Sequence, residues 1–448
     1  MNYEELAAET AARARKHGAD QADVYLVSTT EFGVQIRKGE VETLTQAGSK
    51  GMGIRVFVDH RQGFASTTDF SEDALDRLIT NVVGLARNAD QKPENALSED
   101  AVSVESRDLQ IYDPELENIP AEKKIALAKS CERAAFEFDP RITNSEGAGF
   151  GSEISTTVIA NSLGSHHSYR STACSLYCAP LAELDGKKQV DYEYSYRRVI
   201  AELDKPETVG RKAAQRVLRK LGARKAPTQT ATVVFEGRVA GRIWSAVIAA
   251  INGDAVYKGM SFLKESLGNQ IAASTVTLID DGTLLRGAGS APFDGEGIPT
   301  RRNVLIENGV LKMFQYDTLT SRKVGAGVKS TANARRSYNV APSIGPFNVY
   351  LEPGSLTAEQ IIEAIPNGFY VTDMMGGGAN PVTGDFSIGA SGLWIENGQL
   401  TYAVEEVTIA ASMNSILMGI EKIGSDLLFN SSIVSPTFQV AEMTISGE

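Results

Sequence analysis

The chain has 448 residues, of which 42% are hydrophobic and 22% charged, and its formal net charge is -12. This composition is typical of two or three folded globular domains, and it excludes disordered, collagen-like and coiled-coil proteins. Three scattered cysteines favour neither a disulfide framework nor a tetrahedral zinc site, and the acidic charge argues against direct binding of nucleic acid.

The sequence predicts neither a membrane span nor a secretory signal. No run of about 18 apolar residues occurs in it. Residues 1–10 carry acidic side chains where a signal peptide has a basic stretch followed by an apolar one. We therefore expect a cytoplasmic protein without a membrane partner.

The first 90 residues predict a helix, a group of antiparallel strands and a second helix. Asn2 and Glu5 form the pattern of a capping box, and Gly18 is placed to end the helix that they begin. Lys38-Gly39 predicts a tight hairpin turn, and the second helix begins at Ser71. The expected strands are Ala22–Val27, Phe32–Arg37, Val41–Gln46 and Gly53–Val58. The apolar face of the second helix consists of Leu75, Leu78, Ile79, Val82 and Ala86. This order predicts a two-layer α/β domain with an antiparallel sheet.

The next segment is expected to complete an N-terminal domain. Residues 88–118 are polar and acidic without a clear period, which indicates a long loop or crossover, and Pro120 suits the start of a helix. Further strands are expected near 141–147, 153–160, 166–178 and 189–199. The helix Thr208–Lys225 carries seven basic residues and no acid, and we interpret it as a solvated linker face because it lacks the interleaved aromatics of a nucleic-acid patch. A boundary near Ala226–Thr228 then divides the chain into domains 1–225 and 226–448.

The second half predicts a β-rich domain with a few helices. A strand at Ala231–Phe235 precedes a helix at Val239–Ile251. Two later hairpins, Leu305–Leu311 and Trp394–Leu400, share the sequence Ile-Glu-Asn-Gly, whose Asn-Gly pair suits a type I′ turn. Either a duplicated β unit or two independent turns explains this similarity. Further helices are expected at Thr357–Ile365 and Asn414–Ile423. The overall fold class is therefore expected to be α+β, with a strongly curved, barrel-like C-terminal domain.

The histidines and cysteines do not form the pattern of a familiar catalytic site. The second half has no histidine, and no Gly-x-Ser-x-Gly elbow occurs, which argues against Ser-His-Asp and Cys-His hydrolases. His166, Cys174 and Cys178 share one side of a predicted strand, but at about 3.3 Å per residue they lie too far apart to hold one ion. We expect His17 and His60 at the surface and Cys131 in the core. None of these three residues is predicted to be catalytic.

Two glycine-rich regions offer other chemistry. Asp280, Asp281, Asp294 and Glu296 lie among glycines, where they either bind a hard cation, act as acid and base, or form turns. In Met374–Phe386 three consecutive glycines either let another chain approach the backbone or form a complex turn. Gly147-x-Gly149-x-Gly151 has only part of a dinucleotide fingerprint, and we interpret it as a bend between strands.

Several segments resemble the TldD/PmbA family, most closely its PmbA branch, which is also called TldE and is described as a modulator of DNA gyrase. They occur in the family's order over nearly the whole chain. They are Glu40–Glu42, Gly51–Val56, Pro292–Arg302, Lys329–Asn333, Asn380–Ser387, Trp394–Gly398 and Val404–Ala410.

The resemblance implies a subunit of a two-subunit zinc protease. TldD-type subunits carry a His-Glu-x-x-x-His motif on a helix and a cysteine ligand near the C-terminus. Here Trp244 and Ala249 occupy the histidine positions, Ser245 occupies the glutamate position, and residues 430–436 contain no cysteine. The resemblance therefore implies that this chain has no catalytic residue, metal ligand or cofactor of its own, and that the zinc belongs to a TldD-like partner.

The implied function is that of a PmbA/TldE-like subunit in a TldD-type complex that cleaves unfolded or linear peptides. The implied partner is a TldD-like subunit in a heterodimer, or a second copy in a homodimer. The peptide-binding residues would be Gly376, Gly377, Gly378, Asn380 and Asp385, because glycine-rich backbone can pair with an extended peptide. Two alternatives are a homodimeric, non-enzymatic peptide- or partner-binding protein and a metal-dependent hydrolase that uses the carboxylates of 280–296.

Overall fold

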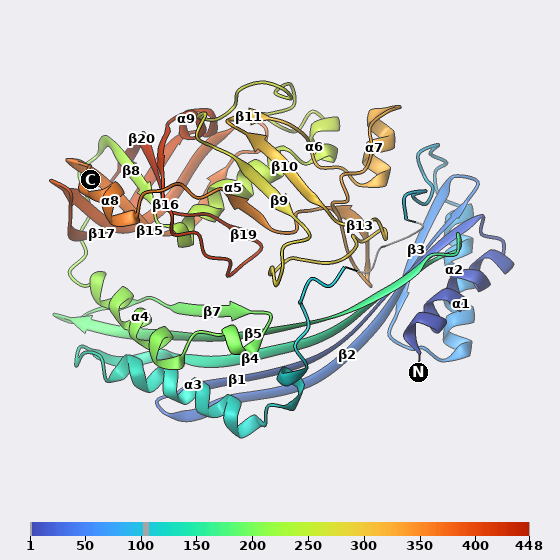
Figure 1. The fold of residues 1–448 in the computed structure, drawn as a ribbon, viewed down its shortest axis with the longest axis horizontal. Coiled ribbons are helices and arrows are strands. Elements are labelled where there is room, and N and C mark those ends of the chain that lie inside the picture. Colours follow the sequence, from blue (N-terminus) through green and yellow to red (C-terminus); the bar gives the residue numbers. More distant parts are fainter. Residues whose placement is uncertain (1, 102–106, 448) are drawn as a thin grey trace.

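A long curved sheet and a β-barrel form the two halves of the molecule in the computed structural model, which describes residues 2–101 and 107–447 (Figure 1). The first sheet has the strand order β3-β2-β1-β4-β5-β6, and β7 also pairs with β5. Its strands are β1 (Gln21–Arg37), β2 (Glu40–Val58), β3 (Arg61–Thr67), β4 (Ile142–Asn161), β5 (His166–Leu184), β6 (Lys187–Val190) and β7 (Glu193–Arg197). Neighbouring strands in this sheet are antiparallel, as predicted.

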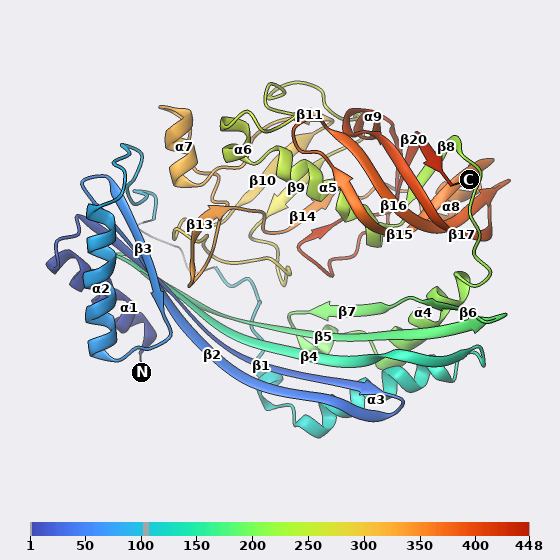
Figure 2. The same cartoon turned by 180° about the vertical axis from the view of Figure 1, so that it is seen from behind.

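Four helices cover this sheet in two pairs. The helices α1 and α2 pack at one end, and α3 and α4 pack at the other (Figures 1 and 2). They are α1 (Tyr3–Lys16), α2 (Glu72–Arg87), α3 (Ala121–Phe136) and α4 (Pro206–Arg219), with short 3-10 helices at Pro114–Asn118 and Ile200–Glu202. The helix that begins after Ser71 buries all five residues of its predicted apolar face, so that prediction is confirmed.

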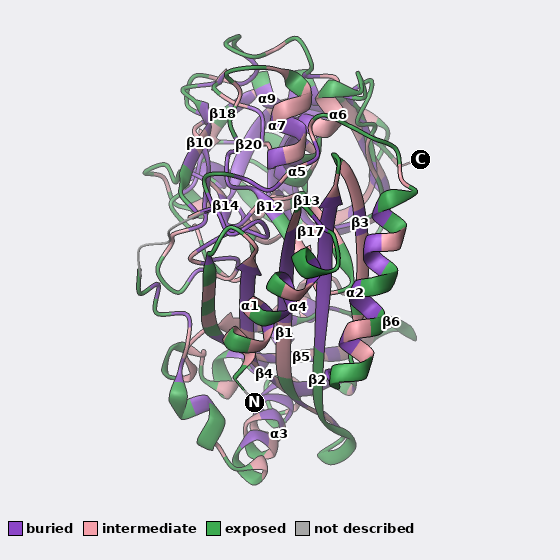
Figure 3. Cartoon of the chain, turned by 90° about the vertical axis from the view of Figure 1, so that its right-hand side faces the viewer, coloured by how far each residue is buried: buried purple, intermediate pink, exposed green. Residues whose placement is uncertain are grey.

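The strands are longer than predicted. The expected pairs Ala22–Val27 with Phe32–Arg37, and Val41–Gln46 with Gly53–Val58, each form one continuous strand. The prediction of four short strands was wrong because the polar residues between them stay in the ladder, with neighbours on both sides of β1. Residues 40–50 of β2 are exposed, whereas residues 51–57 are buried (Figure 3).

Two other local predictions have opposite outcomes. Lys38-Gly39 forms the expected turn, with φ of 53° and 79°, the positive values that a type I′ turn needs. The segment Gly147–Gly151 does not bend between two strands, because it lies inside β4 and faces Tyr177 of β5 across the ladder. A side chain at Gly149 would come within 2.4 Å of the Tyr177 ring, so glycine there permits close packing.

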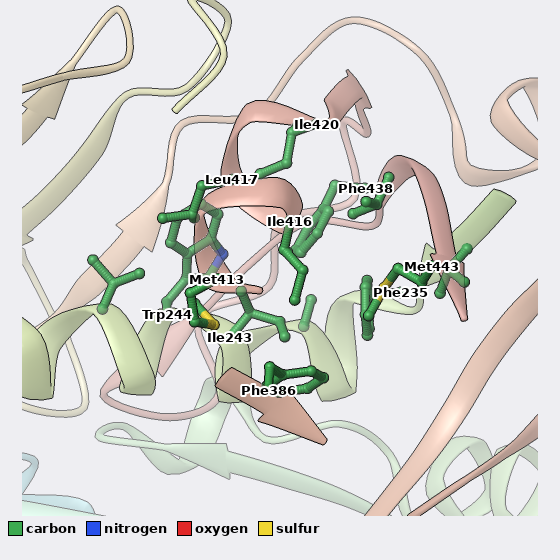
Figure 4. Packing of buried hydrophobic residues seen from close by; sticks show 14 of the residues in the cluster. Phe235, Ile243, Trp244, Phe386, Met413, Ile416, Leu417, Ile420, Phe438 and Met443 are labelled. Carbon is green, nitrogen blue, oxygen red and sulfur yellow. The ribbon is translucent and has the colours of Figure 1, made fainter. Parts of the chain in front are cut away.

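The second half contains the barrel. The order β17-β16-β15-β8-β20 closes on itself through pairing of β17 with β20, and β18 extends the sheet from β20. Its strands are β8 (Gln229–Phe235), β15 (Asn367–Ala379), β16 (Asp385–Glu396), β17 (Gln399–Ser412), β18 (Ile420–Ile423) and β20 (Phe438–Ser446). Helices α5 (Gly237–Ala250) and α9 (Met413–Met418) contribute buried side chains to its core (Figure 4).

A smaller sheet and a hairpin complete this half. The order of the smaller sheet is β11-β10-β9-β14-β19. The remaining elements are β9 (Leu278–Asp281), β10 (Arg302–Glu307), β11 (Val310–Leu311), β12 (Ala334–Ser337), β13 (Val340–Ile344), β14 (Val349–Leu351), β19 (Ile433–Val434), α6 (Gly253–Tyr257), α7 (Thr318–Val324) and α8 (Ala358–Glu363). The α+β class with a barrel-like C-terminal domain is confirmed. Among the described residues, no helix is long and apolar enough to cross a membrane.

The local predictions in this half are largely confirmed. Asn308-Gly309 and Asn397-Gly398 turn two hairpins with positive φ, but the hairpins lie in different sheets. Thr357 and Gln360 cap α8 as a capping box. The single helix expected at Asn414–Ile423 was wrong: α9 ends at Met418, and Ile420–Ile423 pairs with β20 as a strand.

Candidate functional site

Two cavities lie where β6 and β7 of the first sheet meet the barrel. The smaller, of about 250 Å³, is lined from the N-terminal half by Gln189 and Lys220 and from the barrel by Met375 and Gly389, among others. The larger, of about 440 Å³, extends from Glu193 to the C-terminal segment that contains Ser435. We call these two cavities together the interdomain site.

An ion-pair network holds this junction together. Asp191 pairs with Lys220, which lines the smaller cavity, and with Arg238, which lines the larger one, each at 3.2 Å. Burial raises the pKa of Asp191, but Lys220 and Arg238 reverse that effect and hold the pKa below its ordinary value. The carboxylate is therefore a fixed negative charge that joins both halves.

Glu236, the residue before α5, makes a second link. Its carboxylate pairs with Arg216 at 3.0 Å and with Arg219 at 3.1 Å, and Arg216 also binds Glu193. Burial disfavours ionisation of Glu236, yet Arg219 and Arg216 hold its pKa below the ordinary value. The solvated face predicted for the basic helix was therefore wrong for Arg216, Arg219 and Lys220. Their acidic partners come from distant parts of the chain, which no local pattern reveals.

The three glycines at 376–378 form a bulge next to the smaller cavity. Met375 pairs with Gly389 and Gly378 with Ser387, so Gly376 and Gly377 lie opposite a single residue of β16 and fall out of the ladder. Both have positive φ, of 60° and 56°, and both are exposed. The cavity wall contains Met375 but not these glycines. The exposed backbone fits contact with an extended chain, and peptide binding there stays a prediction.

Asn380 and Asp385 shape the turn that follows this bulge. The Asn380 side chain accepts hydrogen bonds from the backbone N–H groups of Val382, at 2.9 Å, and Thr383, at 3.3 Å. The Asp385 carboxylate accepts from the Thr383 hydroxyl at 2.6 Å. Both residues are exposed, so they hold the hairpin tip while their remaining lone pairs face solvent.

The helix α5 carries the three residues compared above with a zinc motif. Trp244 is fully buried, packs 5.8 Å from the ring of Phe438, and donates its indole N–H to Ser435 at 3.1 Å (Figure 4). Ser245 and Ala249 are exposed, and the Ser245 hydroxyl donates to Gly241 within the helix. An indole is a donor only, and a methyl group has no lone pair, so these side chains do not fit Zn²⁺.

The carboxylates of 280–296 are buried and accept hydrogen bonds from neighbouring groups. Asp280 accepts hydrogen bonds from Gln315, Asn333 and the backbone of Phe347, while burial raises its pKa to about 6. Asp294 accepts from three backbone N–H groups, and burial together with Glu296 raises its pKa. Nowhere in residues 2–101 and 107–447 do three or more His, Cys, Asp or Glu side chains form a group that could hold a metal.

The histidines and cysteines lie outside the interdomain site. His60 contacts the carbonyl of Asn95 at 3.2 Å, and His167 contacts the Ser165 hydroxyl at 2.8 Å. The cysteines are free and buried, and Cys131 of α3 lies in the core, as expected. Sequence reasoning missed Asp191, Glu236 and Arg238. The only local signal was the position of Glu236 directly before a helix.

Comparison with known proteins gives the same family over the whole length. Domain models of the PmbA/TldA metallopeptidase family match residues 22–86 as domain 1, 114–221 as the central domain and 228–447 as the C-terminal domain. The chain is 34% identical over 445 residues to metalloprotease PmbA of Escherichia coli O157:H7. The alignment covers 99% of this chain and 96% of that protein. A metalloprotease PmbA homologue of Haemophilus influenzae is 33% identical, and the alignment covers 97% of this chain and 94% of that protein.

Solved structures agree. A Bacteroides thetaiotaomicron protein, described as a candidate modulator of DNA gyrase, has a TM-score of 0.91 at 29% identity and covers 99% of this chain and 98% of its own. TldE of Thermococcus kodakarensis shares the fold, with a TM-score of 0.89 at 21% identity. The superposition covers 98% of this chain and 99% of that one. The chain belongs to the PmbA/TldD family of metallopeptidases.

Proposed function

We propose that this chain is the subunit without zinc in a TldD-type metalloprotease complex that cleaves unfolded or linear peptides. The observation that supports the proposal is the set of side chains on α5 at the positions related to the zinc motif. A buried indole, an exposed hydroxyl and a methyl group occupy positions 244, 245 and 249. Membership of a metallopeptidase family supports the reaction class. The zinc and the attacking water would belong to a TldD-like partner.

The contribution of this chain would be to bind and orient the peptide. The exposed backbone at Gly376 and Gly377, which has no register partner in the β15–β16 ladder, would offer N–H and C=O groups to an extended chain, which gives affinity with little sequence preference. Asn380 and Asp385 hold the hairpin tip that presents this backbone, and Gly378 completes the bulge. The interdomain site lies beside the bulge, because Met375 lines its smaller cavity.

The proposal is tested by metal analysis combined with peptide cleavage. The purified chain, prepared without chelator, should contain no stoichiometric zinc and should not cleave an unfolded peptide. Addition of a TldD-type partner should produce cleavage. Stoichiometric zinc together with cleavage by the single chain would contradict the proposal. Peptide binding by a homodimer, with no cleavage when the partner is present, would instead favour a non-enzymatic binding protein.

A further inference from the structure

A third cavity lies between the curved sheet and the C-terminal half, and its wall shares no residue with the interdomain site. The N-terminal half contributes Tyr25 and Tyr169 to this wall, and the C-terminal half contributes Ala288, Asp294 and Arg336, among others. The cavity encloses about 100 Å³. A water molecule needs on the order of 10–15 Å³ by this measure, so there is room for a few waters or one small polyatomic ion.

Arg336 is the unusual group in this wall. Its side chain is 0% exposed, and its Nη1 donates to Asp23 at 2.8 Å. Its Nε and Nη2 have no hydrogen-bond partner in the described part of the chain. These two nitrogens form the side-on edge of a guanidinium, which holds a carboxylate or phosphate through two parallel hydrogen bonds. Arg141 makes this pairing at the surface, where its Nε and Nη2 donate to Asp139 at 2.9 and 2.8 Å.

The neighbouring carboxylates are already occupied by other donors. Asp23 accepts from Nε of Arg55 at 3.0 Å as well as from Arg336. Glu296 accepts from Arg55 at 3.2 Å and from a backbone N–H. Asp294 accepts from three backbone N–H groups. The side-on edge of Arg336 is therefore a buried, charged donor pair without an acceptor among residues 2–101 and 107–447.

An anion would remove an unfavourable arrangement. A buried charged donor loses its hydration, and this loss is costly when no hydrogen bond replaces it. Burial lowers the pKa of Arg336, and although Asp23 opposes this effect, the charge of Arg55 adds to it. Two further guanidinium groups, those of Arg198 and Arg335, line the same cavity, and Arg335 is exposed. They place more positive charge at the cavity.

We propose that this cavity binds one small oxyanion, of the size of phosphate or acetate, through the Nε–Nη2 edge of Arg336. Because Arg336 also binds Asp23 of β1, the anion completes a charge cluster that joins the two halves of the chain. Its effect is to stabilise their junction. This site is independent of peptide cleavage.

Thermal unfolding of the full chain tests the site, with inorganic phosphate, acetate or chloride at equal ionic strength. Phosphate, acetate or both should raise Tm saturably above the value in chloride, and the two arms identify the preferred oxyanion. Arg336→Lys keeps the charge but lacks the side-on edge. It should raise the anion concentration that gives half of the Tm rise at least tenfold. Arg141→Lys, the matched surface control, should leave it unchanged.

A second variant covers the case in which Arg336→Lys does not fold. Ala288→Leu adds side-chain volume at the cavity wall and keeps every charged group, so it should abolish the anion-dependent rise in Tm. The proposal is overturned if no saturable rise over chloride occurs, since the cavity then binds neither oxyanion in preference to chloride. It is equally overturned if Ala288→Leu or Arg336→Lys responds to the anions as the unmodified chain does.

Discussion

Trp244 of α5 donates its indole N–H to the hydroxyl of Ser435, 3.1 Å away, and both side chains are buried. The bond joins the helix to the segment between β19 and β20, so the position that the family resemblance relates to a metal ligand has a packing role in this chain. Ser435 also lines the larger cavity of the interdomain site. The packing of α5 and the shape of that cavity therefore depend on the same contact.

Replacement of Trp244 by Ala should destabilise the chain strongly. The indole is fully buried against Phe438, and loss of a buried Trp costs about 3–5 kcal/mol through lost burial and the cavity that remains. The free energy of unfolding from urea titration measures this loss. Ser245→Ala, on the exposed side of the same helix, should change stability by less than about 0.5 kcal/mol. Equal effects of the two variants would disprove the packing role.

Gly376 offers the sharpest test of peptide binding. A side chain there would meet nothing within 4 Å, and Asn tolerates its φ of 60°. Gly376→Asn should therefore cost less than about 1 kcal/mol of stability, while its side chain obstructs the exposed backbone and slows peptide cleavage by the assembled complex. Gly377 is unsuitable, since a side chain there would lie 2.2 Å from the Ser387 carbonyl. Unchanged cleavage by Gly376→Asn would show that the bulge is only structural.

Loss of the Glu236 charge should weaken the junction between the halves. Glu236→Gln leaves Arg216 and Arg219 without this partner in a largely buried site, which should cost about 3 kcal/mol at pH 7. Since the folded state holds the pKa of Glu236 below its ordinary value of 4.5, its contribution is present above that value and is lost as pH falls through the folded pKa. Urea titrations at pH 7 and in the acid range should show a smaller pH dependence in the variant. An unaltered pH dependence would exclude this linkage.

Two turn glycines should differ in their tolerance of Ala. Gly39 and Gly309 have φ of 79° and 80°, so each substitution forces an alanine into the left-handed region, at roughly 1–2 kcal/mol. A side chain at Gly39 meets nothing within 4 Å, whereas at Gly309 it would lie 2.2 Å from the carbonyl of Ala272. Gly309→Ala should therefore lower Tm clearly more than Gly39→Ala. Similar shifts would mean that the surrounding loop moves without cost.

The elements set by short-range rules were predictable. The cap at Asn2, the apolar face of α2, the capping box at Thr357 and the Asn-Gly turns all depend on residues within a few positions of one another. The α+β class follows from their order. The family segments are also contiguous in the sequence, and for that reason the resemblance was visible before the fold.

Only the tertiary structure decided the rest. β1 continues through its polar middle because β2 and β4 supply hydrogen bonds on both sides, and neither partner is adjacent in sequence. Arg216 has no acidic residue three or four positions away on its own helix, yet it binds Glu193 and Glu236, one from each half of the chain. Likewise, the Nε–Nη2 edge of Arg336 has no acceptor among the described residues, and this depends on which distant groups the fold places around it. A sequence determines the conformations that each short segment prefers, but the partner of a charge or a strand depends on which distant surfaces the packed chain brings together.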